Sequence, residues 1–169
     1  FVFNETTRKF TAIYTPQTRG EYTVTGTYSQ ATNCTITNGT LTVNEHIPDF
    51  KDLQDIIDAA TTSVIYLNGT NYTAKPGQSN VIINKTLTII GGSIDDSSLR
   101  STLDAKGQCR IFNIANGVNV TLKNINFING KDTSSSGGAI YHSGSGSVTV
   151  ANSSFTNTTA KNNGGAIYN

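Results

Sequence analysis

The chain has 169 residues, of which 36% are hydrophobic and 14% are charged, and its formal net charge is +1. The twelve basic residues are scattered rather than clustered with aromatic ones, which argues against a nucleic-acid partner. The longest apolar runs, such as residues 64–67, are too short to span a bilayer. Thr, Asn, Gly and Ser supply 76 residues, about 45% of the chain. Because Thr favours strands while the other three favour turns, this composition predicts an all-β fold.

Residues 1–45 predict antiparallel strands, because apolar residues alternate with polar ones in "KFTAIYTP", "EYTVTGTYS" and "TNGTLTVN". Three strands cannot close a sandwich, which needs about seven. The stretch resembles the last three strands of a bacterial immunoglobulin-like repeat of long cell-surface proteins, with Tyr22 where such domains place a corner tyrosine. The resemblance implies the C-terminal part of an Ig-like β-sandwich domain over residues 1–45, with its first half upstream.

Residues 46–60 predict a linker followed by a capping helix. Pro48 favours an extended backbone just before it, and Asp49 is suited to cap a helix N-terminus. Apolar residues then recur at helical spacing, at Phe50, Leu53, Ile56, Ile57 and Ala60. A repeat protein must cover the open end of its core, and an amphipathic helix at the start of a repeat array does this.

Residues 61–169 contain an internal repeat. "GGAIY" begins at Gly137 and again at Gly164, and residues 120–131 align with residues 148–159 at an offset of 28. A period of 27 to 28 residues made of short β runs indicates a solenoid. The leucine spacing and helical half of leucine-rich repeats are absent, so we expect a parallel β-helix. Because the chain stops soon after a repeat begins, we expect further coils to follow in a longer parent protein.

The alignment also predicts which side chains stack from one coil to the next. Asn124 matches Asn152 and Phe127 matches Phe155, so we expect an amide ladder and an aromatic ladder. Residues 87–92, "LTIIGG", form a weaker third copy of the same strand. The paired glycines of each "GGAIY" are expected to turn the coil where side chains do not fit.

The repeat zone resembles the right-handed β-helix repeats of adhesin-like surface proteins from methanogenic archaea, and the Gly-Gly-Ala-Ile and Phe-x-x-Asn repeats of polymorphic outer-membrane proteins. The segments that carry this are "INKTLTIIGG", "RIFNIANGVNVTLKNINFING", "GGAIY" and "SSFTNTTA". The resemblance implies a right-handed, pectate-lyase-like solenoid at the cell surface, anchored to the envelope through other parts of the parent protein. Its partners would be glycans or proteins of a partner cell.

Catalytic motifs are sparse in the repeat zone. Polygalacturonase-like enzymes carry carboxylate pairs, Gly-His-Gly and Arg-x-Lys on successive coils, and here only Asp95-Asp96 matches. Charged residues gather between Asp95 and Arg110, which we interpret as a solvated loop. His142 has no acidic or cysteine neighbour, so it is expected at the surface rather than as a ligand. The sequence therefore predicts no catalytic residue, metal or cofactor.

Binding and modification sites are the remaining candidates. Tyr141 and Tyr168 occupy equivalent positions and would form an aromatic strip, as a binding feature or as simple solenoid packing. Of nine Asn-x-Ser/Thr sequons, the turn sites Asn38, Asn68 and Asn71 are the best glycosylation candidates. Three functions follow: a non-catalytic adhesin-like surface protein, a carbohydrate-active β-helix enzyme whose catalytic coils lie outside this chain, or a structural spacer. The first is the primary prediction.

Overall fold

The computed structural model describes residues 2–4, 9–11, 20–24, 39–43, 47–96 and 98–169. The chain forms two compact units, Phe1–His46 and Ile47–Asn169, which are described separately below. Within the described ranges α1 is the one helix, and its 10 residues are too few to cross a bilayer.

The first unit contains two antiparallel strand pairs. β1 (Val2–Asn4) pairs with β2 (Lys9–Thr11), and β3 (Gly20–Val24) pairs with β4 (Gly39–Val43). The last three strands coincide with the three predicted from sequence alternation, while β1 was not predicted. The antiparallel character is confirmed, and the immunoglobulin-like sandwich stays a prediction.

The second unit opens with α1 (Phe50–Ala59), which begins at Asp49 as predicted. The Asp49 carboxylate accepts hydrogen bonds from the backbone amides of Lys51 and Asp52, and the Asp52 carboxylate accepts from the amide of Asp49. This reciprocal pair is a capping box, which satisfies amides that have no partner inside the helix. The helix therefore starts where the sequence can satisfy its first turn.

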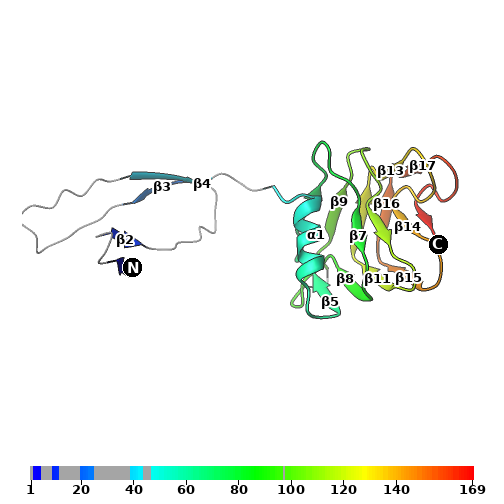
Figure 1. Ribbon diagram of the computed structural model, residues 1–169, viewed down its shortest axis with the longest axis horizontal. Helices are drawn as coiled ribbons and strands as arrows, with labels where there is room; N and C mark the ends of the chain where they lie inside the picture. Colours follow the sequence, from blue (N-terminus) through cyan, green and yellow to red (C-terminus); the bar gives the residue numbers. More distant parts are fainter. Residues whose placement is uncertain (1, 5–8, 12–19, 25–38, 44–46, 97) are drawn as a thin grey trace, which may run out of the picture. The chain divides into compact units, whose positions relative to one another are not determined.

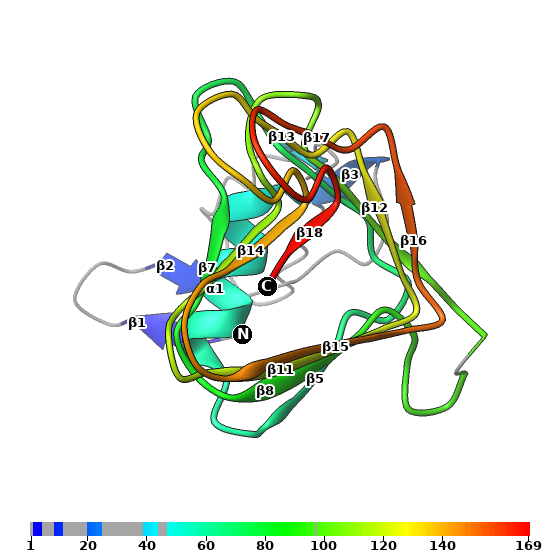
Figure 2. The ribbon, with the colours of Figure 1, turned by 90° about the vertical axis from the view of Figure 1, so that its right-hand side faces the viewer.

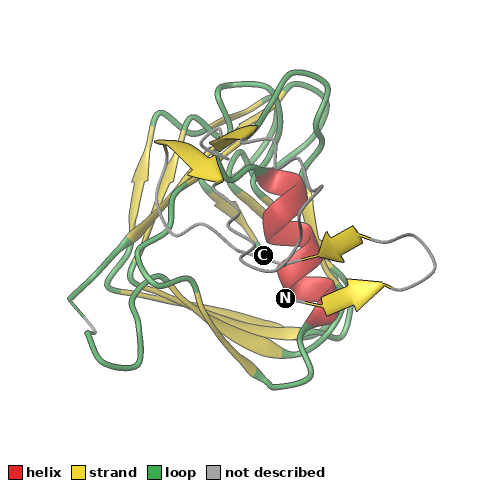
Figure 3. Cartoon of the chain, turned by 90° about the vertical axis from the view of Figure 1, so that its left-hand side faces the viewer, coloured by secondary structure: helices red, strands yellow, loops and turns green. Residues whose placement is uncertain are grey.

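α1 covers the first coil of a solenoid, lying across its end in Figures 1 and 3. The helix buries its own Phe50, Leu53 and Ile57 side chains against that coil. Ile56 is 39% exposed, so its predicted inward position is wrong. The buried stripe is therefore narrower than the sequence pattern predicted. The Gln54 side chain also bonds both backbone groups of Ile82, at 2.7 and 3.1 Å, and thereby pairs with the edge strand.

Three four-stranded parallel sheets form the walls of the solenoid, which makes about four coils. Figure 2 looks along its axis and shows the walls enclosing a roughly triangular section. The first wall contains β7 (Val81–Ile83), β10 (Phe112–Ile114), β14 (Ile140–His142) and β18 (Ile167–Tyr168). The second contains β5 (Val64–Tyr66), β8 (Leu87–Ile90), β11 (Asn119–Lys123) and β15 (Ser147–Ala151). The third contains β6 (Tyr72–Thr73), β9 (Ser101–Asp104), β12 (Ile125–Ile128) and β16 (Ser154–Thr156).

A fourth, shorter parallel pair, β13 (Lys131–Asp132) with β17 (Thr159–Ala160), lies at the corner that follows the third wall. The parallel β-solenoid with a capping helix is thus confirmed, and its right-handed sense stays a prediction. The strands pair in the predicted register: Val120 lies opposite Val148, and Phe127 opposite Phe155. Leu87 lies opposite Val120 on its other side, which confirms residues 87–92 as a further copy of the strand.

Coil length explains why that third copy was weak. Asn124 alone separates β11 from β12, and Asn152 and Ser153 separate β15 from β16, whereas residues 91–100 separate β8 from β9. The earlier coil therefore carries a ten-residue loop where the later ones make a corner of one or two residues. Because the loop replaces the asparagine, sequence alignment at a fixed period finds only the strand that precedes it.

The corners demand residues that tolerate a left-handed backbone. Asn124 and Asn152 have φ of 57° and 49°, and Gly137 and Gly164 have φ of 72° and 63°. Asparagine and glycine adopt this region more readily than other residues. Gly138 is required for another reason, since a Cβ there would lie 2.1 Å from the backbone oxygen of Gly165. The predicted role of the paired glycines as turn residues is confirmed.

The core of the second unit runs the length of the solenoid between the walls. Inward positions alternate with outward ones along each strand, as in β8, β10 and β12. Phe112 and Phe127 meet edge to face, with ring centroids 6.0 Å apart. The largest fully buried side chains belong to Phe50, Leu53, Ile57, Ile83, Ile89, Leu103, Ile111, Phe112, Leu122, Ile125, Phe127 and Ile140.

Candidate ligand-binding surface

The two tyrosines predicted to stack do so. Tyr141 on β14 lies in register with Tyr168 on β18, and their rings are 5.3 Å apart and within 10° of parallel. The guanidinium of Arg110 lies 4.6 Å from the centroid of the Tyr141 ring. Arg110 precedes β10, one coil before β14, whereas β18 is one coil after it. Both faces of the Tyr141 ring are therefore covered, which leaves its edge and hydroxyl for a ligand.

Arg110 is a buried structural hub. Its Nε donates to the Gly137 carbonyl at 2.8 Å, and its Nη2 donates to the Ser136 carbonyl and to the Asp132 carboxylate, both at 2.7 Å. Only 8% of the residue is exposed. The interpretation of residues 95–110 as a solvated loop is wrong at this end, because Arg110 faces the corner of the next coil rather than solvent.

The charged cluster between Asp95 and Arg110 is divided by the fold. Asp95 and Asp96 are exposed in the loop after β8, where Asp96 accepts hydrogen bonds from Ser98. Asp104 is buried at the end of β9 and accepts from the Lys106 ammonium at 2.8 Å and from the Asn129 amide at 2.8 Å. Burial acts to raise the pKa of Asp104, but these two donors outweigh it and the pKa is lowered.

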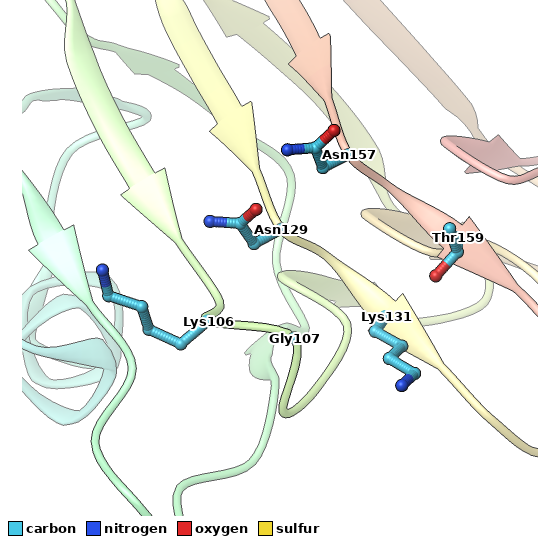
Figure 4. A pocket seen from close by; sticks show the side chains of 6 residues that line it. All are labelled: Lys106, Gly107, Asn129, Lys131, Asn157 and Thr159. Carbon is cyan, nitrogen blue, oxygen red and sulfur yellow. The ribbon is translucent and has the colours of Figure 1, made fainter.

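A hollow of about 340 Å³ lies beside Asp104, at the corner after the third wall. We name it the lysine pocket, and Figure 4 shows its lining. Successive coils contribute to it: one supplies a Lys-Gly turn, the next an Asn and a Lys, and the last an Asn and a Thr. The lining residues are Lys106, Gly107, Asn129, Lys131, Asn157 and Thr159.

The backbone of the lysine pocket is as regular as that of the Asn124 corner. Lys106, Asn129 and Asn157 all have left-handed φ, between 52° and 55°. The amide of Asn129 bonds the Thr156 carbonyl at 3.0 Å, and the amide of Gly107 bonds the Asn129 carbonyl at 2.8 Å. Lys106 falls within the charged cluster that was interpreted as a solvated loop, and Lys131 was not predicted as a site residue. The sequence pattern that points to this corner is the identity of Asn129 and Asn157 at the 28-residue offset.

The ladder residues are brought together as predicted. The Asn152 amide donates to the Asn124 side-chain oxygen at 2.7 Å, and the rings of Phe127 and Phe155 stack with centroids 4.8 Å apart and planes 9° apart. Both contacts join neighbouring coils and lie at a corner or inside the core. They hold the solenoid together rather than forming a ligand site.

His142 is not at the surface, so that prediction is wrong. It is 1% exposed, because β14 turns its side chain inward between Ile140 and the loop that follows. Its Nδ1 lies 2.6 Å from the Asn169 side-chain oxygen, and its Nε2 has no partner among the described residues. A Cβ at Gly146 would lie 3.1 Å from this Nε2, so the glycine leaves room for the ring.

The glycosylation candidates differ in accessibility. Asn68 is exposed at a turn with φ of 53°. Asn71 is exposed too, and its side-chain oxygen accepts from the backbone amide of Thr102 at 2.8 Å, which leaves the amide nitrogen directed elsewhere. Asn38 lies outside the described residues. Both described candidates are exposed residues, and their glycosylation stays a prediction.

Cys109 was expected to be a small buried hydrophobe, with a disulfide to Cys34 as the alternative. Cys109 is a free thiol, partly buried against the core, and Cys34 lies outside the described residues. Burial raises the pKa of the Cys109 thiol to about 11. The thiol is therefore protonated at neutral pH.

No cluster of three or more His, Cys, Asp or Glu suited to a metal ion occurs within the part of the chain that the structure describes. Comparison with known proteins adds no assignment: no protein-family model, no curated protein and no solved structure matches this chain.

Proposed function

We propose that this chain belongs to an adhesin-like cell-surface protein, whose solenoid binds glycans or proteins of a partner cell without acting on them chemically. The sequence resemblance to the surface proteins of methanogenic archaea and to polymorphic outer-membrane repeats supports this setting. So does the resemblance of residues 1–45 to an immunoglobulin-like repeat. Glycosylation at Asn38, Asn68 and Asn71, and envelope anchoring through other parts of the parent protein, belong to the same proposal.

The observation that supports binding is the ordered polar wall outside the solenoid. Ser147 donates to the Asn119 side-chain oxygen at 3.0 Å, and Ser154 donates to that of Asn126 at 2.9 Å, each across one coil step. Thr121 and Thr149 lie opposite each other in the register of the second wall. Hydroxyl and amide groups both donate and accept hydrogen bonds, as sugar hydroxyls do. Rows of such groups repeating every ~4.8 Å suit a polymeric ligand.

A structural spacer is the second candidate, and one observation favours it. Both faces of the half-buried Tyr141 ring are covered by the chain's own side chains, Arg110 and Tyr168. An aromatic platform for sugars needs a free face. The tyrosine pair thus contributes to stiffness, and the binding role falls to the polar walls.

The test is retention of the 169-residue chain on insoluble polysaccharides and intact cells, with soluble sugar assayed in the same tubes with and without Ca²⁺. Retention without sugar release is the expected result. Release of sugar would contradict the proposal and favour a carbohydrate-active enzyme. Absence of both retention and release would favour the spacer.

A further inference from the structure

The lysine pocket contains polar groups that the fold does not use. Lys106 and Asn129 are engaged by Asp104. The ammonium of Lys131, the amide of Asn157 and the hydroxyl of Thr159 have no hydrogen-bond or ion-pair partner among the described residues. All three residues are exposed. The solenoid therefore places one cation, one amide and one hydroxyl around a hollow with nothing of its own to satisfy them.

The charge at the pocket is positive. Lys106 and Lys131 line it, and the nearest carboxylate, Asp104, is 7% exposed and already bonded to two donors. The next carboxylate along the chain, Asp132, is taken by Arg110. An uncompensated lysine on a flexible stem can turn its three donors toward an anion. In Figure 4 the two lysine side chains leave the ribbon on opposite sides of Gly107 and extend away from each other. Because Lys106 is paired with Asp104, Lys131 is the lining cation left for an anion.

The chemistry of the lining selects the class of ligand. No apolar side chain lines the pocket, whereas recognition of a peptide relies on buried apolar or aromatic anchors. The amide of Asn157 and the hydroxyl of Thr159 pair with groups that both donate and accept. A volume of about 340 Å³ lies at the lower end of the range for small-molecule sites. A compact, hydroxyl-rich, anionic group fits these conditions.

We propose that the lysine pocket binds a carboxylated sugar unit of a glycan, with Lys131 on the carboxylate and with Asn157 and Thr159 on the sugar hydroxyls. The assignment rests on the proposed glycan-binding function and specifies its ligand class. The contributing residues come from successive coils, so the pocket exists only when neighbouring coils are stacked.

The test is titration of the 169-residue chain with trigalacturonate in low salt. The Lys131→Gln variant should weaken binding by about tenfold, as expected for loss of a charge-assisted hydrogen bond, and the fully methyl-esterified trimer should not bind. Lys131→Arg should stay within about threefold of the parent chain, because it keeps the charge. Lys123→Gln is the matched control: it removes one charge from an exposed lysine on β11, outside the pocket, and should change affinity less than twofold. Thermal unfolding of every variant establishes that the fold is retained.

Three results would overturn the inference while leaving the proposed function intact. One is retention on neutral polysaccharides with no binding of trigalacturonate. Another is equal weakening by Lys131→Gln and Lys123→Gln, which would mean general charge attraction. The third is equal or tighter binding of polyglutamate or a sulfated galactose, which would assign the pocket to acidic peptides or sulfate esters. Failure of retention on every polysaccharide and cell type would instead contradict the proposed function itself.

Discussion

The side-chain amide of Asn152 donates a 2.7 Å hydrogen bond to the side-chain oxygen of Asn124, its counterpart one coil earlier. Both residues have a left-handed backbone, with φ of 49° and 57°. Each asparagine therefore performs two tasks at once: it turns the corner between two walls, and it links its coil to the neighbouring one.

Substitution of Asn152 separates these tasks. Asn152→Gly keeps the left-handed backbone but removes the side chain that donates to Asn124 and accepts from Arg100, and it should lower the free energy of unfolding by about 1 kcal/mol for each bond. Asn152→Leu removes the same contacts and also places in a left-handed backbone a residue that disfavours it more than asparagine does, which costs a further ~1–2 kcal/mol. Urea denaturation measures both. Equal losses in the two variants would show that the backbone conformation carries no cost.

Arg110→Ala should be among the most damaging single substitutions in the second unit. It leaves the Asp132 carboxylate and the Gly137 carbonyl without their buried donor, and removal of one partner from a buried ion pair typically costs about 3–5 kcal/mol. Lys123→Ala, at an exposed position on β11, is the control and should cost less than about 1 kcal/mol. A thermal melt followed by circular dichroism compares them, and a near-neutral Arg110→Ala would contradict the hub described for this residue.

Gly138→Ala tests the close approach of two coils. The new Cβ would lie 2.1 Å from the Gly165 oxygen and 2.4 Å from the Thr159 oxygen, both backbone atoms that cannot move without separating the strands. We expect loss of the cooperative unfolding transition or a large fall in its midpoint. Gly77→Ala is the comparison, since a Cβ there meets nothing within 4 Å and only its φ of 84° is unfavourable. Similar behaviour of the two variants would mean that the coils are less tightly packed than described.

The helix cap should make stability depend on acid. The Lys75 ammonium, 2.6 Å from the Asp49 carboxylate, holds the pKa of that carboxyl well below its usual range. A carboxyl with a lowered pKa in the folded state binds fewer protons there than when unfolded. Its stabilisation is therefore complete above the unfolded pKa of about 3.9 and is lost as pH falls below it.

Asp49→Asn isolates this charge, because asparagine is an equally good helix N-cap. The variant should be less stable than the parent chain at pH 7 and should lose less stability between pH 5 and pH 2, as measured by urea unfolding. Some acid dependence will remain, since the pKa values of Asp104 and Asp132 are also lowered. A parallel pH dependence in both proteins would rule out the Lys75 contact as its source.

The thiol of Cys109 should resist alkylation while the chain is folded. With a pKa of about 11 it is almost entirely protonated at pH 8, and the thiolate is the reactive form. In a Cys34→Ser background, iodoacetamide should modify Cys109 much more slowly in buffer than in 8 M urea. Rapid labelling of the folded protein would show that the thiol is more accessible than its burial implies.

The sequence predicted the parts of the fold that are specified by a local motif or by the repeat. The Asp49 cap, the Asn124 and Phe127 ladders and the paired glycines were all identified, because each depends on local geometry or on repetition at a fixed offset. The predicted exposure of two polar residues was wrong. Arg110 and His142 are polar residues buried by contacts with other coils, and no local pattern distinguishes them from surface residues.

The lysine pocket was missed for a related reason. Its lysines, Lys106 and Lys131, do not occupy equivalent positions in the repeat, so alignment at a constant offset does not bring them together. They line one hollow because Lys106 lies at the corner after β9 and Lys131 begins β13, at the same corner one coil later. Repetition predicts what coils share, whereas the proposed site uses lysines that the coils do not share.

The parallel pairing of the walls also determines how the second unit would respond to tension. The hydrogen bonds between coils run along the solenoid axis, and α1 and β18 belong to its first and last coils. A pull on the two ends would load these bonds one coil at a time rather than many together. The domain would then extend in steps at modest force, lengthening under load and rewinding from the intact coils once the load is removed.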